Sequence, residues 1–113
     1  VSVAAGIPDF RSPGGMYDTL RPDLLTATQM ERRAMQMDPT AVVSWEVFRQ
    51  NQLPYLELRR PFIRGVLAHQ DKNKDAYRPT LSHFFIRVCH DKGLLRRVYT
   101  QNIDGLDYKT GTP

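Results

Sequence analysis

At the start of the chain, the pattern of apolar and polar positions predicts the end of a helix and then a loop. Residues 1–5, followed by Gly6 and Pro8, are typical of the last turns of a helix that stops at a glycine. Residues 9–23 hold several prolines and glycines among polar side chains, which predicts a long surface loop. Long loops are often functional, so side chains in this segment are candidates for binding or catalysis.

Two start signals predict helices in the middle of the chain. Thr28 and Glu31 have the spacing of a capping box. The apolar face of that helix would consist of Met30, Ala34 and Met37. Asp38, followed by Pro39, predicts a second helix that ends near Asn51. Its apolar stripe would consist of Ala41, Trp45 and Phe48.

The segments that follow are less regular. We expect Pro54 and Pro61 to limit the helices around them, because proline lacks a backbone donor and clashes with the preceding turn. The polar run at residues 70–74 carries no periodicity and predicts an exposed connection.

The last third of the chain has the clearest periodicity. Thr80 is placed to cap a helix that ends at Gly93, and residues 94–100 are typical of a short strand. The apolar face of the helix would consist of Leu81, Phe84, Phe85, Val88 and Cys89. A helix, a glycine and a strand in this order form half of a βαβ unit, so the predicted fold class is α/β with a parallel sheet.

Composition narrows the class of protein. With 113 residues, 41% hydrophobic and 25% charged, the chain suits one modest globular domain or a piece of one, and we expect an internal piece. It contains no apolar stretch long enough to span a bilayer, and no signal peptide is visible, so we expect no membrane partner. A single cysteine, Cys89, fits a reducing compartment, either nucleus or cytoplasm, with the mitochondrion also open.

The net charge of +4 is carried mainly by arginine, which suits phosphate or carboxylate recognition. The arginine pairs are scattered along the chain and do not form one basic stripe with interleaved aromatics, so we expect no direct contact with nucleic acid. His83 and His90 lack the spacing and partners of a metal pair, and His69 carries no special signal. We therefore predict no metal ligands in this chain and interpret Cys89 as a small core residue.

The loop at residues 6–12 combines a glycine, a carboxylate, a ring and a guanidinium. Arg11 offers a fork of donors suited to a phosphate or pyrophosphate, and Phe10 is suited to shield a ring from water. The alternative is structural: Arg11 paired with Asp9 or Asp18, and Phe10 in the core.

The segment after the predicted strand is the second candidate. Ligands of open α/β sheets bind beyond the carboxyl ends of the strands, where Gln101, Asn102 and Asp104 lie. Amide and carboxylate groups suit a carboxamide or sugar hydroxyls. The alternative is an Asx turn that leads into the next helix.

Both candidate segments resemble known signatures. Residues 2–13 and 99–106 resemble the two signature blocks of sirtuins, the NAD-dependent protein deacylases. Residues 78–96 are similar to the segment before the second block in the subclass with the histone and tubulin deacetylases. The resemblance implies an incomplete catalytic domain with a partial Rossmann-like parallel sheet. Its expected parts are a cofactor-binding helix end and loop at 1–20, a helical insertion and small module at 21–77, and a helix, strand and nicotinamide-pocket loop at 78–113.

The resemblance also implies roles for individual residues. Ala5, Gly6 and Ile7 would line the cofactor cleft, and Asp9 would order the loop. Phe10 would cover the nicotinamide side, and Arg11 would contact the diphosphate or position the reacting ribose.

In the second block, Gln101 would bind the nicotinamide ribose and Ile103 would be a further cofactor contact. Asn102 and Asp104, with Ile7, would receive the carboxamide. Asn102 and Asp104 would also be the catalytic residues. Val3 and Asp107 depart from the residues common in the family at these positions.

The implied activity is NAD-dependent removal of acyl groups from lysine in proteins such as histone or tubulin, giving nicotinamide and acyl-ADP-ribose. The family's general-base histidine and structural zinc cysteines would lie beyond this chain, so we expect the chain alone to be inactive and prone to aggregate. Alternatives are a non-catalytic remnant of the NAD cleft, an interaction module, and a sirtuin-type ADP-ribosyltransferase.

Overall fold

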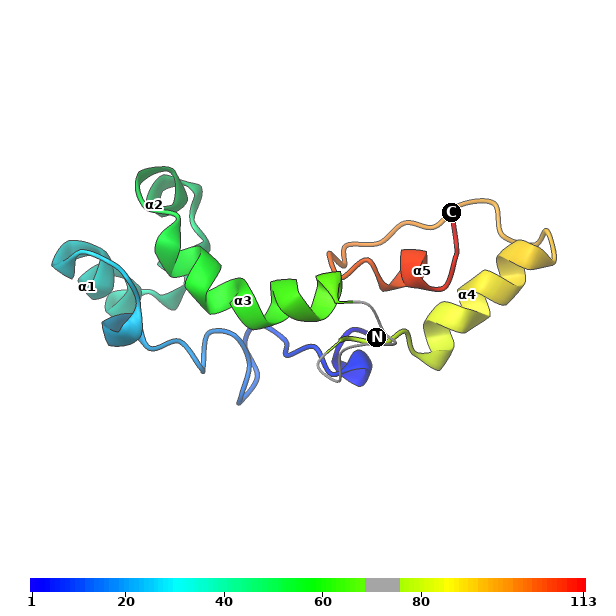
Figure 1. Ribbon diagram of the computed structural model, residues 1–113, viewed down its shortest axis with the longest axis horizontal. Coiled ribbons are helices and arrows are strands. Elements are labelled where there is room, and N and C mark those ends of the chain that lie inside the picture. The colour runs from blue at the N-terminus through cyan, green and yellow to red at the C-terminus, as the bar shows by residue number, and fades with distance from the viewer. Residues whose placement is uncertain (69–75) are drawn as a thin grey trace. The chain divides into compact units, whose positions relative to one another are not determined.

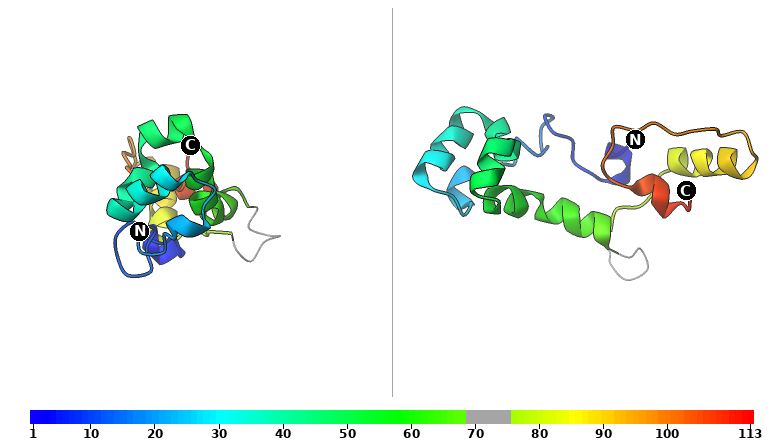
Figure 2. Two further views of the ribbon diagram at one scale, coloured as in Figure 1. Left: turned by 90° about the vertical axis from the view of Figure 1, so that its left-hand side faces the viewer. Right: turned by 90° about the horizontal axis from the view of Figure 1, so that it is seen from above.

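The computed structural model describes residues 1–68 and 76–113, and these residues form helices joined by turns and irregular segments (Figures 1 and 2). His69 and the predicted connection at 70–74 lie outside the described residues. Three short 3₁₀ helices are η1 (Val3–Ala5), η2 (Pro22–Leu24) and η3 (Pro39–Val43). The α-helices are α1 (Gln29–Met37), α2 (Trp45–Gln50), α3 (Leu53–Leu67), α4 (Leu81–Asp91) and α5 (Leu106–Lys109). Within this described part, every helix is too short or too polar to cross a lipid bilayer.

The predicted α/β fold with a Rossmann-like parallel sheet is wrong, because no strand or bridge occurs in the ranges that the structure describes. Residues 94–100, the predicted strand, have no regular secondary structure. A strand exists only when its backbone groups pair with a neighbouring strand. Here the N–H groups of Leu94 and Leu95 donate instead to the Cys89 carbonyl at the end of α4.

The chain divides into two compact units. The middle unit comprises Pro8–Pro61, and the terminal unit comprises Val1–Ile7 together with Phe62–Pro113. The division that the resemblance implies, at residues 20 and 77, stays a prediction.

The middle unit has a small apolar core made of Leu20, Met35 and Val42. The predicted capping box at the start of α1 is confirmed: the Glu31 N–H donates to the Thr28 hydroxyl (3.2 Å), and the Thr28 N–H donates to the Glu31 carboxylate (2.7 Å). Because these bonds are local in sequence, the pattern alone was enough to predict them.

The predicted apolar face of α1 is wrong. Met35 is 1% exposed, whereas Met30 is 79% exposed. The side of the helix that carries Met35 also carries Arg32, whose guanidinium donates to the Leu25 carbonyl (3.1 Å). This polar contact and the core around Met35 decide which side of the helix is covered.

The second start signal is confirmed, although it begins a shorter element. The Asp38 carboxylate accepts the Thr40 N–H (2.9 Å) and starts η3. Ser44 then caps α2 by accepting the Val47 N–H (3.2 Å), and α2 ends at Asn51. The single helix predicted between Asp38 and Asn51 is therefore divided into η3 and α2, because Ser44 supplies a second cap.

Pro61 does not limit a helix, contrary to prediction, and lies inside α3. Proline withholds a single N–H, here the donor that would reach the Glu57 carbonyl, and the helix continues with its remaining bonds. The boundary between the two units falls directly after this residue.

In the terminal unit, α4 is confirmed at both ends. The Thr80 N–H donates to Nδ1 of His83 (3.0 Å) at its start. At its end Gly93 is left-handed (φ 69°), and its N–H donates to the His90 carbonyl (2.9 Å). Gly6 ends η1 in the same conformation (φ 86°), as the glycine pattern predicted.

The predicted apolar face of α4 is also wrong. Leu81 is 86% exposed and Phe85 is 66% exposed, whereas His83 is buried. His83 lies on a covered side of α4, where its ring accepts the Thr80 N–H, and α5 packs against this helix.

Replacing Thr28 with alanine should loosen α1 by about 1 kcal/mol, because the Glu31 N–H loses its acceptor. Hydrogen exchange of the α1 amides would measure this in the whole protein. Thr28→Ser, which keeps the hydroxyl, should exchange at the wild-type rate. Equal protection in both variants would contradict the assigned cap.

Acidification should weaken the contact between Glu57 and Thr26. The Thr26 hydroxyl (2.6 Å) and N–H (2.8 Å) donate to this carboxylate and lower its pKa below the ordinary 4.5. The stabilisation is therefore complete above pH 4.5 and is lost as the pH falls through the lowered value. Carboxyl NMR titration should place the midpoint below 4.5 and show it rising in Thr26→Val. An unchanged midpoint in that variant would contradict the contact.

Candidate functional site

The predicted loop after residue 8 is a compact, closed loop in the middle unit. The Met16 N–H donates to the Asp9 carbonyl (2.8 Å), and the Tyr17 N–H donates to the Phe10 carbonyl (3.0 Å). Between these bonds the Gly15 N–H donates to the Ser12 carbonyl (2.7 Å). The loop therefore holds its own shape through backbone bonds at its base and tip.

The Asp9 side chain completes this closure. Its carboxylate accepts the Ser12 N–H (3.0 Å) and the Ser12 hydroxyl. A Cβ at Gly15 would lie 2.6 Å from Asp9 Oδ1, so the close approach requires glycine. The Asp9 carboxylate oxygens are therefore engaged within the loop.

Phe10 and Arg11 lie exposed on this loop. Phe10 is 46% exposed and lies 6.2 Å, centroid to centroid, from the Tyr17 ring. The Arg11 guanidinium carbon lies 6.0 Å from the centre of the same ring. Among the described residues Arg11 forms no ion pair, and Asp18 accepts the Gly14 N–H (2.8 Å) instead. The structural alternative, an ion-paired Arg11 and a buried Phe10, is therefore wrong.

The residues before this loop belong to the terminal unit. Ala5 ends η1 and is half-buried, and Gly6 follows it in the left-handed conformation. Ile7 is 6% exposed, and its N–H donates to the Ser2 carbonyl (3.2 Å). Ser2 thus fixes the position of Ile7.

Ser2 also holds Asp104, a residue 102 positions away in the sequence. Its hydroxyl donates to Asp104 Oδ2 (2.5 Å), and the Leu106 N–H donates to Oδ1 (3.1 Å). Asp104 is 3% exposed. The contact to Leu106 is the Asx turn that the sequence left open, and it leads into α5.

The residues before Asp104 are exposed. The Asn102 backbone N–H donates to the Thr100 hydroxyl (3.0 Å), whereas the side-chain amides of Gln101 and Asn102 form no hydrogen bond with any described residue. Ile103 is 67% exposed. Two carboxamides without a partner among the described residues, those of Gln101 and Asn102, therefore shortly precede in sequence the carboxylate of Asp104, which is held by two hydrogen bonds.

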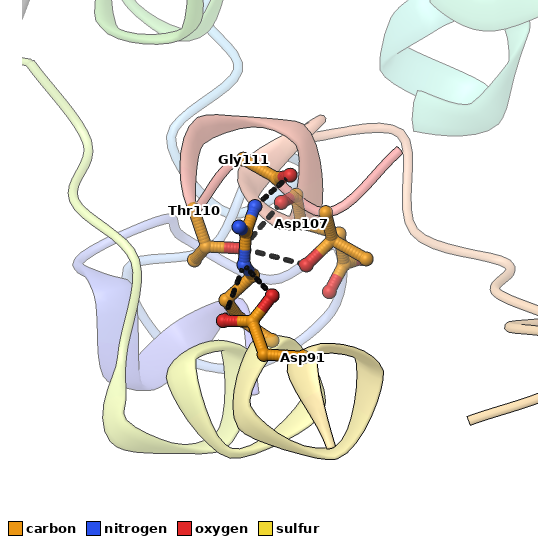
Figure 3. Close-up of polar contacts among 6 residues, drawn as sticks. Asp91, Asp107, Thr110 and Gly111 are labelled. Atoms are coloured by element: carbon orange, nitrogen blue, oxygen red, sulfur yellow. Dashed lines mark hydrogen bonds and ion pairs between the residues drawn. The ribbon is translucent and has the colours of Figure 1, made fainter. Parts of the chain in front are cut away.

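Contacts from α4 hold the turn that follows α5 (Figure 3). The Arg87 guanidinium pairs with Asp91 (2.8 Å) and donates to the Gly111 carbonyl. The Thr110 hydroxyl donates to the Asp107 carbonyl (2.6 Å). Oδ1 of Asp107 is buried and has no hydrogen-bond partner among the residues that the structure describes.

Lys109 ties α5 to the rest of the terminal unit. Its ammonium group donates to the carbonyls of Gly65 (3.5 Å), Ala68 (3.4 Å) and Tyr77 (3.5 Å). Positive charge near the end of α3 is favourable because the last helical carbonyls carry partial negative charge. The segment that begins at Asp104 is therefore anchored on both sides.

A cleft of about 310 Å³ also lies in the terminal unit, lined among others by Arg96, Arg97 and Asp107. No predicted site residue lines it. Within the described part of the chain, no three histidine, cysteine, aspartate or glutamate side chains lie close enough to hold a metal ion.

The sequence did not point to two supporting residues, one in each unit. Ser2 lies within the first signature block, but its bond to Asp104 depends on the fold. Tyr17 is the ring beneath Arg11. The sequence signal for Ser2 is a hydroxyl shortly before the loop, and that for Tyr17 is an aromatic ring at the end of the loop.

Comparison with known proteins gives one family. The sequence model of the protein family described as "Sir2 family" matches residues 1–113. The chain is 41% identical to NAD-dependent protein deacetylase hst2 of Schizosaccharomyces pombe over 114 residues, covering all of this chain and 28% of that protein. It is 38% identical to NAD-dependent protein deacetylase sirtuin-3 of Mus musculus over 117 residues, with the same coverage of both chains.

A third relative is NAD-dependent protein deacetylase sir-2.1 of Caenorhabditis elegans, 39% identical over 114 residues, with 98% of this chain and 15% of that protein covered. The chain thus spans between 15% and 28% of the length of these relatives. No solved structure matches the chain.

Replacing Ser2 with alanine should destabilise the turn into α5 by about 1–3 kcal/mol, because a buried oxygen of Asp104 loses its donor. Hydrogen exchange of the α5 amides in the whole protein would report it. Ser2→Thr keeps the hydroxyl and should stay close to wild type. The assignment fails if Ser2→Ala leaves the Leu106 amide as protected as before.

Proposed function

This chain belongs to the Sir2 family, and we propose that the whole protein is an NAD-dependent protein-lysine deacetylase that yields nicotinamide and acyl-ADP-ribose. The names of three relatives, all NAD-dependent protein deacetylases, support the proposal. Acyl-lysine in a protein would be the substrate, with histones and tubulin as candidates.

The observation that carries the proposal is the polar arrangement at residues 101–104. The carboxamides of Gln101 and Asn102 have no partner among the described residues, and Asp104 beside them is held by Ser2 and Leu106. Groups that are rigid or unpaired in this way suit a ligand with its own carboxamide and hydroxyls. The residues present therefore fit the nicotinamide riboside part of NAD.

The loop of the middle unit, taken by itself, carries groups that suit a diphosphate. Arg11 is exposed and forms no ion pair with the described residues, so its donors are available to a diphosphate. Phe10 is exposed beside it and is suited to exclude water from a bound ring. Asp9 contributes by closing the loop through Ser12.

We assign the remaining contacts as follows. Bound NAD supplies a glycosidic bond whose leaving group is nicotinamide. Asn102 and Asp104 bind and orient the carboxamide and are the catalytic residues of this chain. Gln101 binds the ribose, and Ile103 adds an apolar contact. Further cofactor contacts come from Ala5, Gly6 and Ile7.

Asn102→Ala in the whole protein should abolish nicotinamide release from NAD in the presence of an acetyl-lysine peptide. The substitution removes an exposed amide that makes no internal bond, so the fold should be unaffected. Gln50→Ala, which removes an exposed amide in the middle unit, is the matched control and should retain full turnover.

Asp104→Ala should also abolish turnover, but it removes the acceptor of two hydrogen bonds as well. Asn102→Ala is therefore the decisive variant. Wild-type turnover by Asn102→Ala would contradict the assigned site. Transfer of ADP-ribose to protein without deacetylation would favour the transferase alternative.

A further inference from the structure

We propose that Tyr17 is a positioning residue for NAD: its ring holds the Arg11 guanidinium in the orientation that binds the diphosphate. This inference rests on the proposed function, in which Arg11 is a cofactor contact. Tyr17 lies outside both segments that resemble the signature blocks, residues 2–13 and 99–106.

The carboxylates near Arg11 in the sequence form hydrogen bonds with other groups. Asp9 accepts both the N–H and the hydroxyl of Ser12, and Asp18 accepts the Gly14 N–H (2.8 Å). Neither forms an ion pair with Arg11. The Arg11 guanidinium instead lies over the face of the Tyr17 ring, with its carbon 6.0 Å from the ring centre.

Tyr17 is itself held in place by packing against the core and by a backbone hydrogen bond. Its side chain packs against the core formed by Leu20, Met35 and Val42. Its backbone N–H donates to the Phe10 carbonyl (3.0 Å), and its ring lies 6.2 Å from the Phe10 ring. Tyr17 therefore connects the exposed end of the loop to the rigid part of the unit.

The contact with the Tyr17 ring leaves the N–H donors of Arg11 available to a ligand. A guanidinium attracted to a ring face keeps the N–H donors at its edge for hydrogen bonds. A carboxylate partner would occupy those donors and neutralise the charge. Holding Arg11 over a ring thus restrains the side chain without competing with an anionic ligand.

The test compares Tyr17→Leu, which keeps an apolar side chain but removes the π face, with Tyr17→Phe, which keeps both. Tyr17→Leu should raise the KM for NAD about two- to five-fold with kcat unchanged, since an exposed cation–π contact has about that strength. Tyr17→Phe should match wild type. Tyr17→Met is a second ring-less variant in case leucine disturbs the core.

A double-mutant comparison shows whether Tyr17 acts through Arg11. In an Arg11→Ala background, Tyr17→Leu should leave the KM for NAD unchanged. An added rise there, or equal KM values for Tyr17→Leu and wild type, would overturn the proposal. If the wild-type protein does not turn over NAD at all, the proposed function fails and this inference fails with it.

A second readout needs no NAD. The ring current of Tyr17 should shift the Arg11 δ-methylene NMR signals upfield of those in an unstructured peptide. The shift should persist in Tyr17→Phe and vanish in Tyr17→Leu. An unshifted signal in the wild-type protein would show that the contact does not form, and would overturn the proposal.

Discussion

The hydrogen bond between the Ser2 hydroxyl and the Asp104 carboxylate is the constraint on which the candidate site of the terminal unit depends. It joins segments that lie 102 residues apart and fixes a carboxylate that is 3% exposed. Without the Ser2 hydroxyl, this buried oxygen would lack a donor, and the folded state would lose about 1–3 kcal/mol of stability. The Ser2 carbonyl accepts the Ile7 N–H as well, and one residue thereby positions two proposed contacts of the carboxamide.

The two candidate segments divide their polar groups in the same way. In each, carboxylates stabilise the segment itself: Asp9 closes its loop, and Asp104 binds Ser2 and Leu106. With the described residues, the guanidinium of Arg11 and the carboxamides of Gln101 and Asn102 form no hydrogen bond or ion pair. Asp9 and Asp104 thus fix the backbone beside side chains whose polar groups are available to a ligand, which is what preorganised recognition requires.

Sequence reasoning succeeded where the stabilising bonds are local. The capping box of Thr28, and the glycine ends at Gly6 and Gly93, depend on bonds that close within a few residues. It failed where distant segments decide the outcome. Met35 is covered where Met30 was expected, because the contacts of the unit select the face. The predicted strand at 94–100 failed for the same reason, since a strand is defined by its partner.

For the candidate site, the sequence proposed residues but did not show which neighbours hold them. Asp104 was placed correctly in an Asx turn, offered as the alternative to a ligand contact, yet the contribution of Ser2 could not be read from spacing. The sequence left open whether Arg11 is exposed or pairs with Asp9 or Asp18. The structure answers this because both carboxylates accept backbone N–H groups within the loop.

The central claim is that residues 5–11 and 101–104 bind NAD in the whole protein. Hydrogen exchange measured with and without NAD tests it most directly, because amides in contact with a bound ligand exchange more slowly. The account predicts added protection in both segments and none in α1. Protection confined to other parts of the protein, or none at saturating NAD, would contradict it.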